Sequence, residues 1–238
     1  MITGIIVALP EELTTLTNKK VAKGSFIFIA ENILVVYSGA GSVNAAAGAK
    51  LLIANGATRL ISWGCAAALA MRLNPGDLIL ADKLIDAENI EHIVDLDWHS
   101  HAKKTLEAYL TVSSGNLADS VGIISSSKDK KQMHAKTGAV ALDMESMSIA
   151  KVAKHHSLPV LVIRVIADPV SMSLPKAINY SLNSQGEIVM PKLLFFILLR
   201  PSELPRLIKL GIHFSAAKKT LKSIAKQLDK MTNFTGFE

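Results

Sequence analysis

The 238-residue chain predicts an α/β fold, in which strands and helices alternate along the sequence. Residues 139–168 show this pattern most clearly, with a short apolar strand at Ala139–Leu142, an acidic turn, a helix and a second strand. Ile149 and Val152 share one face of the helix, and lysines occupy the other. Val160–Ile166 is an apolar, largely β-branched run, which is typical of a strand that is covered on both faces.

Two acidic residues, Glu145 and Asp168, follow these two strands. We expect the strands to run parallel, which places both carboxylates at the strand ends where ligands bind in open α/β sheets. Each acid also has a simpler interpretation. Asp143 and Glu145 can complement a helix N-terminus, and Asp168 can open an Asp-Pro turn. Arg164, inside the second strand, needs a partner because an unpaired buried charge is costly.

The N-terminal part of the chain continues the alternation of strands and helices. The expected elements are, in order, a strand at Gly4–Leu9, a helix that opens with Pro10-Glu11-Glu12-Leu13, a hairpin of Ser25–Ala30 and Ile33–Tyr37, and an alanine-rich helix from Val43 to Asn55. The turn Ser38-Gly39-Ala40-Gly41-Ser42 precedes this last helix, whose N-terminal N–H groups can hold an anion. Two glycines also suit a plain tight turn, so both interpretations stay open.

The middle of the chain predicts further strands around one acidic, irregular stretch. The expected elements are, in order, a strand at Leu60–Trp63, a turn at Asn74-Pro75-Gly76-Asp77, a strand at Leu78–Leu84, an irregular stretch from Asp86 to Ser100, a helix at Lys103–Leu110 and a strand at Val121–Ser125. Gly64-Cys65-Ala66-Ala67-Ala68 follows the first of these strands, and its small side chains allow a ligand to approach the backbone.

Composition narrows the class of protein. Half of the residues are hydrophobic, so a chain of this length can bury a sizeable core. Cys65 is the single cysteine, which excludes an internal disulfide and suits a reducing compartment. The N-terminus resembles a first strand rather than a signal peptide, so we expect a cytoplasmic protein. Basic residues are not interleaved with aromatic ones, so we expect no nucleic-acid partner.

One group of residues suggests a metal site at first sight. His92, Asp95, Asp97, His99 and His101 lie close together in the sequence and include common ligand types. Their spacing matches no compact set of ligands for a metal ion. We therefore expect neither a metal nor another cofactor.

The region from about residue 175 onward predicts a helical extension of a single domain that spans residues 1–238. Helices are expected at Pro191–Leu199, Leu204–Leu210 and Ala216–Leu228, and the first two are rich in large apolar and basic residues. These helices can pack on the sheet or at a subunit interface, or they can meet an apolar substrate or a membrane face. The apolar run Leu193–Leu199 is too short to span a bilayer.

An ordered series of stretches resembles the purine nucleoside phosphorylase and uridine phosphorylase superfamily, and within it the methylthioadenosine/S-adenosylhomocysteine nucleosidase branch. The stretches are GIIVALPEEL, SGAGSVNAAAGAKLLIANGA, SWGCAAAL with NPGDLILAD, and ALDMES with RVIADP. Beyond Asp168, DPVSMSLPKAI and the following helices resemble the hopanoid-associated phosphorylase branch, also described as adenosylhopane nucleosidase. The resemblance implies a three-layer α/β/α fold with a mixed, partly barrel-like sheet, and cleavage of the N-glycosidic bond of a purine nucleoside.

The resemblance also implies roles for individual residues. Asp168 would donate a proton to the purine N7, and Glu12 would hold and deprotonate the attacking water, with Arg164 orienting the Glu12 carboxylate. The implied substrate-binding residues are Glu145, which accepts both ribose hydroxyls, and Met144, Cys65, Ala66, Ala67, Ser38 and Gly39. These roles agree with the chemistry, because glycosidic cleavage passes through a cation-like sugar and needs an acid at the leaving group.

Several positions depart from the family pattern. Cys65 and Ala167 stand where the family usually has serines, the second of them next to the catalytic aspartate. Ser62 stands where phosphorylases of the superfamily have a phosphate-binding arginine, and Pro10-Glu11-Glu12 replaces a glycine and an arginine. Because a carboxylate beside phosphate without cations is costly, we expect water rather than phosphate as the nucleophile.

We therefore expect hydrolytic release of adenine from an adenosine derivative with an apolar 5′ substituent, such as adenosylhopane. Two alternatives stay open: a phosphorylase that holds phosphate through Ser38–Ser42 and a neighbouring subunit, and a nucleoside-binding protein with little turnover. The expected partners are the nucleoside, in a lipid-linked form if the hopanoid resemblance holds, the inner face of a membrane as a peripheral contact, and further copies of the chain in a homo-oligomer.

Overall fold

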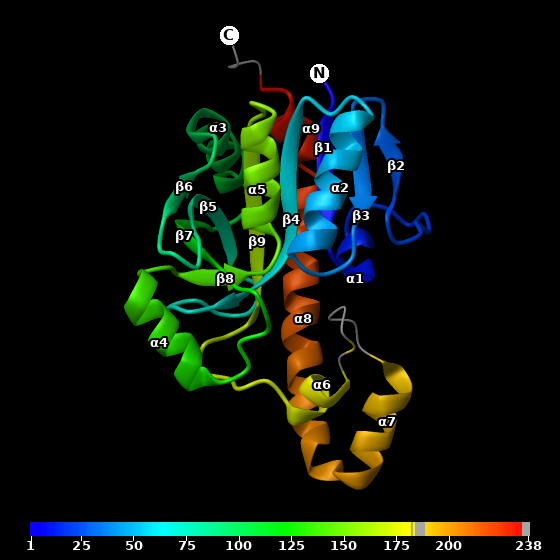
Figure 1. The fold of residues 1–238 in the computed structure, drawn as a ribbon, viewed down its shortest axis with the longest axis vertical. Helices are drawn as coiled ribbons and strands as arrows, with labels where there is room; N and C mark the ends of the chain where they lie inside the picture. The colour runs from blue at the N-terminus through cyan, green and yellow to red at the C-terminus, as the bar shows by residue number, and fades with distance from the viewer. Residues whose placement is uncertain (182, 184–188, 235–238) are drawn as a thin grey trace.

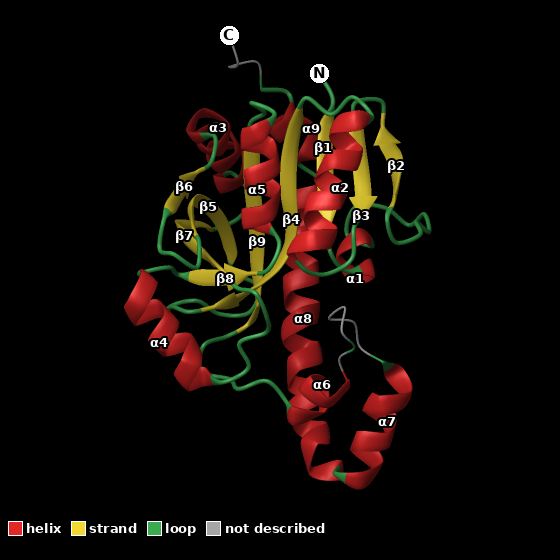
Figure 2. Ribbon diagram, in the orientation of Figure 1, coloured by secondary structure: helices red, strands yellow, loops and turns green. Residues whose placement is uncertain are grey.

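The computed structural model describes residues 1–181, 183 and 189–234, and in this part of the chain a single nine-stranded sheet is flanked by helices (Figures 1 and 2). The strands are β1 (Thr3–Val7), β2 (Ser25–Ala30), β3 (Ile33–Tyr37), β4 (Arg59–Ala68), β5 (Leu78–Ile85), β6 (Glu91–Ile93), β7 (Val112–Asp119), β8 (Ala141–Asp143) and β9 (Val160–Asp168). The helices are α1 (Pro10–Leu13), α2 (Ser42–Ala54), α3 (Leu96–Glu107), α4 (Ser127–Thr137), α5 (Ser146–His155), α6 (Lys176–Ser181), α7 (Met190–Leu199), α8 (Leu204–Ala225) and α9 (Leu228–Thr232), with a 3-10 turn at Pro201–Glu203.

The sheet is mixed and partly closed into a barrel. Its strand order is β2-β3-β1-β4-β8-β7-β5-β6, and β9 pairs with both β4 and β5. The strands β4, β8, β7, β5 and β9 therefore form a closed ring, in which the pairs β4–β8 and β5–β9 are antiparallel and the other pairs are parallel. All nine residues of β9 are buried, as its apolar sequence predicts.

Two apolar layers hold the helices on the sheet. On one face, α2 and α5 contribute residues such as Leu52 and Ile149 to a core with β1, β3 and β4. On the other face, α3, α8 and α9 contribute residues such as Trp98, Leu221 and Met231. This arrangement confirms the predicted three-layer α/β/α fold with a mixed central sheet.

The expectation that Ala139–Leu142 and Val160–Ile166 are parallel strands is wrong. β4 pairs parallel with β9 and antiparallel with β8, so β8 and β9 run in opposite directions. Sequence periodicity carries no information on strand direction, which here follows from closure of the barrel. The two strands nevertheless converge at one point, because Leu142 of β8 and Asp168 of β9 both pair with Ala67 of β4.

Other differences lie in the middle of the chain. The segment Gly64–Ala68 extends β4 rather than following it, and the strand predicted at Val121–Ser125 is instead β7, which ends at Asp119. The sequence of β7, VSSGNLAD, does not alternate apolar and polar residues, so it gave no strand signal. It forms a strand because its backbone pairs with β5 on one side and β8 on the other. The stretch expected to be irregular contains β6 and the start of α3, where the Asp95 side chain accepts a hydrogen bond from the Trp98 N–H.

The C-terminal helices also differ from the prediction. Leu204–Leu210 and Ala216–Leu228 were expected as separate helices, but α8 runs unbroken from Leu204 to Ala225. A lone glycine, Gly211, costs a helix only about 1 kcal/mol, and no proline interrupts the stretch between the two predicted helices. The part of the predicted extension at residues 182, 184–188 and 235–238 lies outside the described residues.

The first half of α8 and all of α7 project from the body of the molecule (Figure 1). We call residues 190–215 the α7–α8 hairpin. They extend beyond the end of the sheet at which α1 and the first turn of α5 lie. Among the described residues, no helix combines the length and the apolar character needed to cross a bilayer.

Candidate functional site

Glu12, in the short helix α1, is held in the candidate site by backbone N–H groups. Its Oε2 accepts hydrogen bonds from the N–H groups of Ala8 (3.1 Å) and Leu9 (3.0 Å), and its Oε1 accepts one from Cys65 (2.8 Å). The side chain is buried, and burial raises its pKa more than these bonds and the charge of Arg164 lower it. Three backbone donors thus fix a carboxylate that retains a tendency to take up a proton.

Arg164 does not orient Glu12 by a hydrogen bond, in contrast to the role that the resemblance implies. Its Nε lies 2.5 Å from Oδ2 of Asp143, and its Nη2 donates to the Ser62 hydroxyl at 2.8 Å. Asp143 also accepts a bond from the Ser146 hydroxyl and another from the Ser146 N–H at the start of α5. The acid opposite Arg164 is therefore Asp143, and Arg164 acts on Glu12 only through its charge.

Glu145 sits between β8 and α5, where its carboxylate reaches the glycine-rich turn. Its Oε1 accepts a hydrogen bond from the Gly41 N–H at 2.8 Å, and its Oε2 lies 3.3 Å from the N–H of Met144. Gly41 adopts a φ of 92°, a conformation that favours glycine. Burial of the carboxyl, together with the negative charge of Asp143, raises the pKa of Glu145 to about 7.

Asp168 ends β9 at a β-bulge. Ala66 pairs with Ile166 and Ala67 pairs with Asp168, so Ala167 is the extra residue, and such bulges re-aim side chains near functional sites. Oδ2 of Asp168 lies 2.6 Å from Nζ of Lys130 in α4, whereas its Oδ1 is buried and has no hydrogen-bond partner among the described residues. Burial raises the pKa of Asp168, although the positive charge of Lys130 opposes this shift.

These acids lie around the last residues of β4. The Cys65 N–H holds Glu12 and Ala67 pairs with Asp168, and two residues along a strand span about 7 Å. Leu142, just before the Asp143–Glu145 turn, also pairs with Ala67. The structure therefore brings together the predicted residues of the site, with Met144, Ala66 and Gly39 on the adjoining segments.

Two residues of the site have roles that the sequence did not indicate. Lys130 was not predicted, because a lysine in a polar helix carries no signal that it will be buried. Ser38 was expected to contact a ligand, but its hydroxyl is within hydrogen-bond distance of two backbone carbonyl oxygens, those of Val7 (3.0 Å) and Gly39 (2.9 Å). Ala167, the residue before Asp168, packs into the core.

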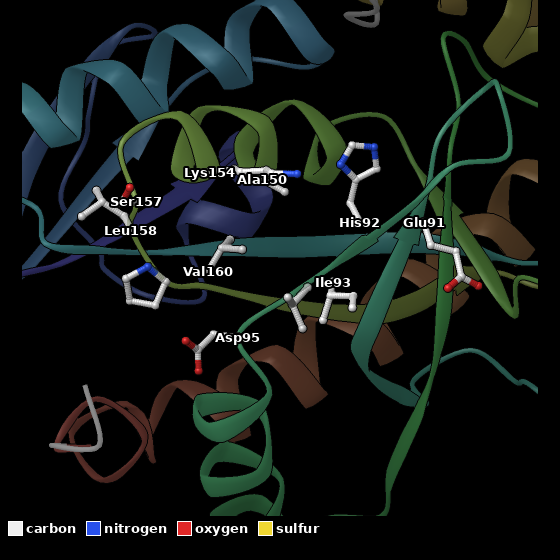
Figure 3. A pocket seen from close by; sticks show the side chains of 11 residues that line it. Glu91, His92, Ile93, Asp95, Ala150, Lys154, Ser157, Leu158 and Val160 are labelled. Atoms are coloured by element: carbon white, nitrogen blue, oxygen red, sulfur yellow. The ribbon is translucent and has the colours of Figure 1, made fainter. Parts of the chain in front are cut away.

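Asp95 and the three histidines between residues 92 and 101 make separate local contacts. His92 pairs with Asp86 at 3.1 Å, and ring nitrogens of His99 and His101 lie near the carbonyl oxygens of Leu80 and Lys230. A hollow of about 670 Å³ lies nearby, between β6, the end of α5 and the start of β9 (Figure 3). It lies at Val160, the opposite end of β9 from Asp168, and so is not part of the candidate site.

Comparisons with known proteins agree with this architecture. A family model described as the phosphorylase superfamily matches residues 3–177. The 5′-methylthioadenosine/S-adenosylhomocysteine nucleosidase of Staphylococcus aureus is 30% identical over 194 residues, which cover 69% of this chain and 85% of that protein.

Solved structures share the fold at lower sequence identity. A futalosine hydrolase of Helicobacter pylori superposes with a TM-score of 0.69 at 19% identity, covering 97% of both chains. The 5′-methylthioadenosine/S-adenosylhomocysteine nucleosidase of Helicobacter pylori, solved with butyl-thio-DADMe-Immucillin-A, gives a TM-score of 0.70 at 21% identity and the same coverage. At these identities the likeness concerns the fold alone.

The close approach of Glu12 to β4 makes Gly64 hard to replace. A Cβ at Gly64 would lie 2.5 Å from Oε1 of Glu12, so we expect Gly64→Ala to lower the free energy of unfolding by about 1–3 kcal/mol. Gly122→Ala is the control, because a Cβ there meets nothing within 4 Å. Urea unfolding measures both, and in a Glu12→Ala background the cost of Gly64→Ala should shrink. An unchanged cost in that background would contradict the contact.

Proposed function

Because the chain belongs to the phosphorylase superfamily, we propose that it is a purine nucleosidase that hydrolyses the N-glycosidic bond of an adenosine derivative and releases adenine. The observation that carries this proposal is the set of three carboxyl groups around the end of β4. Glu12 is fixed by three backbone N–H groups, Glu145 reaches the glycine-rich turn, and Asp168 has one free buried oxygen. This set supplies an acid, a base and negative charge near the sugar.

The proposed reaction uses one carboxyl group for each task. Asp168 gives its proton to N7 of the adenine as the bond between C1′ and N9 breaks, and the bonding electrons leave with the base. The two oxygens of Glu145 accept the vicinal ribose hydroxyls and stabilise the cation-like sugar. Glu12 takes a proton from water as the water oxygen bonds to C1′, which yields free ribose product.

The electrostatics support water over phosphate as the nucleophile. The Gly41 N–H, one of the donors at the N-terminus of α2, is already bonded to Glu145. Arg164 is paired with Asp143, and the hydrogen-bond partners of Glu12 within the described residues are backbone N–H groups without charge. A phosphate beside Glu12 and Glu145 would therefore meet two carboxyl groups, and Arg164, the cation near them in the described part of the chain, is already paired with Asp143.

Removing any of the three carboxylates should abolish most activity while leaving the fold intact. We expect Asp168→Asn, Glu145→Gln and Glu12→Gln each to slow adenine release by about 10²–10⁴-fold, the usual effect of losing an acid or base. Glu11→Gln is a matched control, since Glu11 is the exposed neighbour of Glu12 on the same turn. Adenine release by the wild type should proceed equally well without phosphate.

The same assay separates the competing functions. Strict dependence on phosphate, with formation of a ribose-1-phosphate derivative, would contradict hydrolysis and favour a phosphorylase. Tight nucleoside binding without adenine release would favour a binding protein. Activity within a few-fold of wild type in all three variants would place the active site elsewhere.

The pKa of Glu145 predicts the pH dependence of the reaction. Because this pKa is raised to about 7, the carboxylate that accepts the ribose hydroxyls is lost as the pH falls below that value. We expect kcat/KM to fall about tenfold per pH unit below about pH 7, with the raised pKa of Glu12 adding to the same limb. A kcat/KM that stays constant from pH 5.5 to 8, with folding verified by circular dichroism, would contradict the assignment.

We further propose an apolar 5′ substituent on the substrate, as in adenosylhopane, presented at the inner face of a membrane. The α7–α8 hairpin supports this choice because it exposes many large apolar side chains. They are Met190, Leu194, Phe195, Leu198, Leu199, Leu204, Ile208 and Ile212. Lys192, Arg200, Arg206 and Lys209 are exposed on the same hairpin, a charge that complements anionic lipid.

The position of the hairpin agrees with this proposal. It extends beyond the end of the sheet that carries α1 and the first turn of α5, the elements of Glu12 and Glu145 (Figure 1). Leu204, Ile208 and Ile212 recur every four residues and so share one face of α8. The alternative is that a second copy of the chain covers this face in a homo-oligomer.

The substrate proposal predicts a selective loss of activity. We expect kcat/KM to be higher for an adenosyl lipid in anionic vesicles than for adenosine or methylthioadenosine. The double variant Leu194→Ser/Leu198→Ser should lose this preference by about tenfold or more, since one buried side chain contributes about 1.5–3 kcal/mol. Val121→Ser, which changes an apolar residue that is 91% exposed outside the hairpin, is the control.

Equal rates on all three substrates would contradict the lipid proposal. A double variant that changes the sedimentation of the protein, with no effect on lipid selectivity, would identify the face as a contact between copies of the chain.

A further inference from the structure

The residue before Asp168 carries no hydroxyl that could support the Asp168 side chain. Ala167 stands at that position, and as the extra residue of the β-bulge it packs into the core beside the sheet. Within the described residues, the side-chain partner of Asp168 is instead Lys130, which comes from α4 and follows a serine-rich loop. The support of Asp168 is thus ionic rather than a neutral hydrogen bond.

Three contacts hold the Lys130 ammonium group in this position. Its side chain is fully buried, and Nζ lies 2.6 Å from Oδ2 of Asp168, 2.9 Å from the Met172 carbonyl oxygen and 3.3 Å from that of Pro169. An ammonium group has three N–H donors, so all of them are used. A lysine that only filled space would lose solvation and side-chain entropy without gain, which points to a role for its charge.

The contacts leave the two oxygens of Asp168 inequivalent. Oδ2 faces the ammonium and accepts its hydrogen bond, so a proton on Asp168 belongs on Oδ1. Oδ1 is buried, and no residue in the described part of the chain forms a hydrogen bond with it. A buried polar atom without a partner is rare in folded proteins and indicates a place for a ligand donor or acceptor.

We propose that Lys130 is a positioning residue that directs the proton of Asp168 to Oδ1 and stabilises the Asp168 carboxylate as that proton passes to the base. This inference rests on the proposed nucleosidase function. Before transfer, the ammonium faces a neutral carboxyl group. After transfer, the proton is on the base, the C1′–N9 bonding electrons have left with the base, and the ammonium faces a full negative charge. The interaction is therefore stronger in the transition state than in the ground state, which is the condition for lowering the barrier.

The leaving group provides a test that a purely structural role would not pass. Adenine needs the proton, whereas 4-nitrophenolate leaves a riboside without one. We expect Lys130→Met to lower kcat for adenosine by about 10²-fold or more, within the usual range for general acid catalysis. Its kcat for 4-nitrophenyl riboside should stay within a few-fold of wild type, whereas Glu12→Gln should lose activity on both substrates. Lys131→Met, at the exposed neighbouring position, is the control.

A second measurement follows the charge of Lys130 directly. Asp168 must be protonated to act, so activity on adenosine falls as the pH rises through its pKa. Among the described residues, Lys130 is the charged group that faces Asp168. Loss of its positive charge in Lys130→Met, or in Lys130→Gln if the first variant does not fold, should move the alkaline limb of kcat to higher pH. Lys130→Arg should restore part of the wild-type rate.

The outcomes distinguish this role from the proposed function. A wild type that cleaves neither of these substrates and also releases no adenine from methylthioadenosine or the adenosyl lipid would overturn the nucleosidase function and the role of Lys130 with it. A folded Lys130 variant that loses both activities equally, or keeps full activity on adenosine, or shows no shift of the alkaline limb, would overturn the role of Lys130 alone.

Discussion

The ion pair between Arg164 and Asp143 is the interaction on which the rest of the site depends. It is buried and joins the middle of β9 to the end of β8, with Ser62 and Ser146 completing its hydrogen bonds. Burial alone would lower the pKa of Arg164, but the carboxylates of Asp143, Glu145 and Glu12 raise it instead. A single guanidinium thus makes it possible to gather three carboxylates in one buried region, and removing one partner of such a pair is strongly destabilising.

Closure of the sheet determines where these groups meet. β9 pairs with β4 and β5 at once, which curls the sheet and brings β8 to the carboxyl end of β4. Small residues at Gly64–Ala68 allow Glu12 to approach one side of β4 while Asp168 and the Asp143–Glu145 turn approach from β9 and β8. The bulge at Ala167 then sets Asp168 beside Ala67. Glu12, Glu145 and Asp168 are far apart in the sequence, and the pairing of the strands determines the distances between them in space.

Much of this architecture could be predicted from the sequence, and the failures have physical causes. Apolar runs identified β9 and part of β4, and the acids after two predicted strands identified Glu145 and Asp168 as neighbours in space, whereas Glu12 was implied by the family resemblance alone. Strand direction could not be predicted, because β8 is three residues long and its pairing depends on barrel closure. Lys130 could not be predicted either, since its burial depends on a partner 38 positions later in the chain, and propensity describes only local sequence.

The unbroken helix α8 connects the core rigidly to the α7–α8 hairpin. Its 22 residues span about 33 Å, and its second half is packed against β9 through Ala217, Leu221 and Ile224. Its first half carries the exposed apolar face of the hairpin. Because the second half of the helix is packed in the core, the orientation of its first half relative to the sheet is fixed. A surface that binds the hairpin therefore lies at a fixed distance from β9, the strand that ends in Asp168.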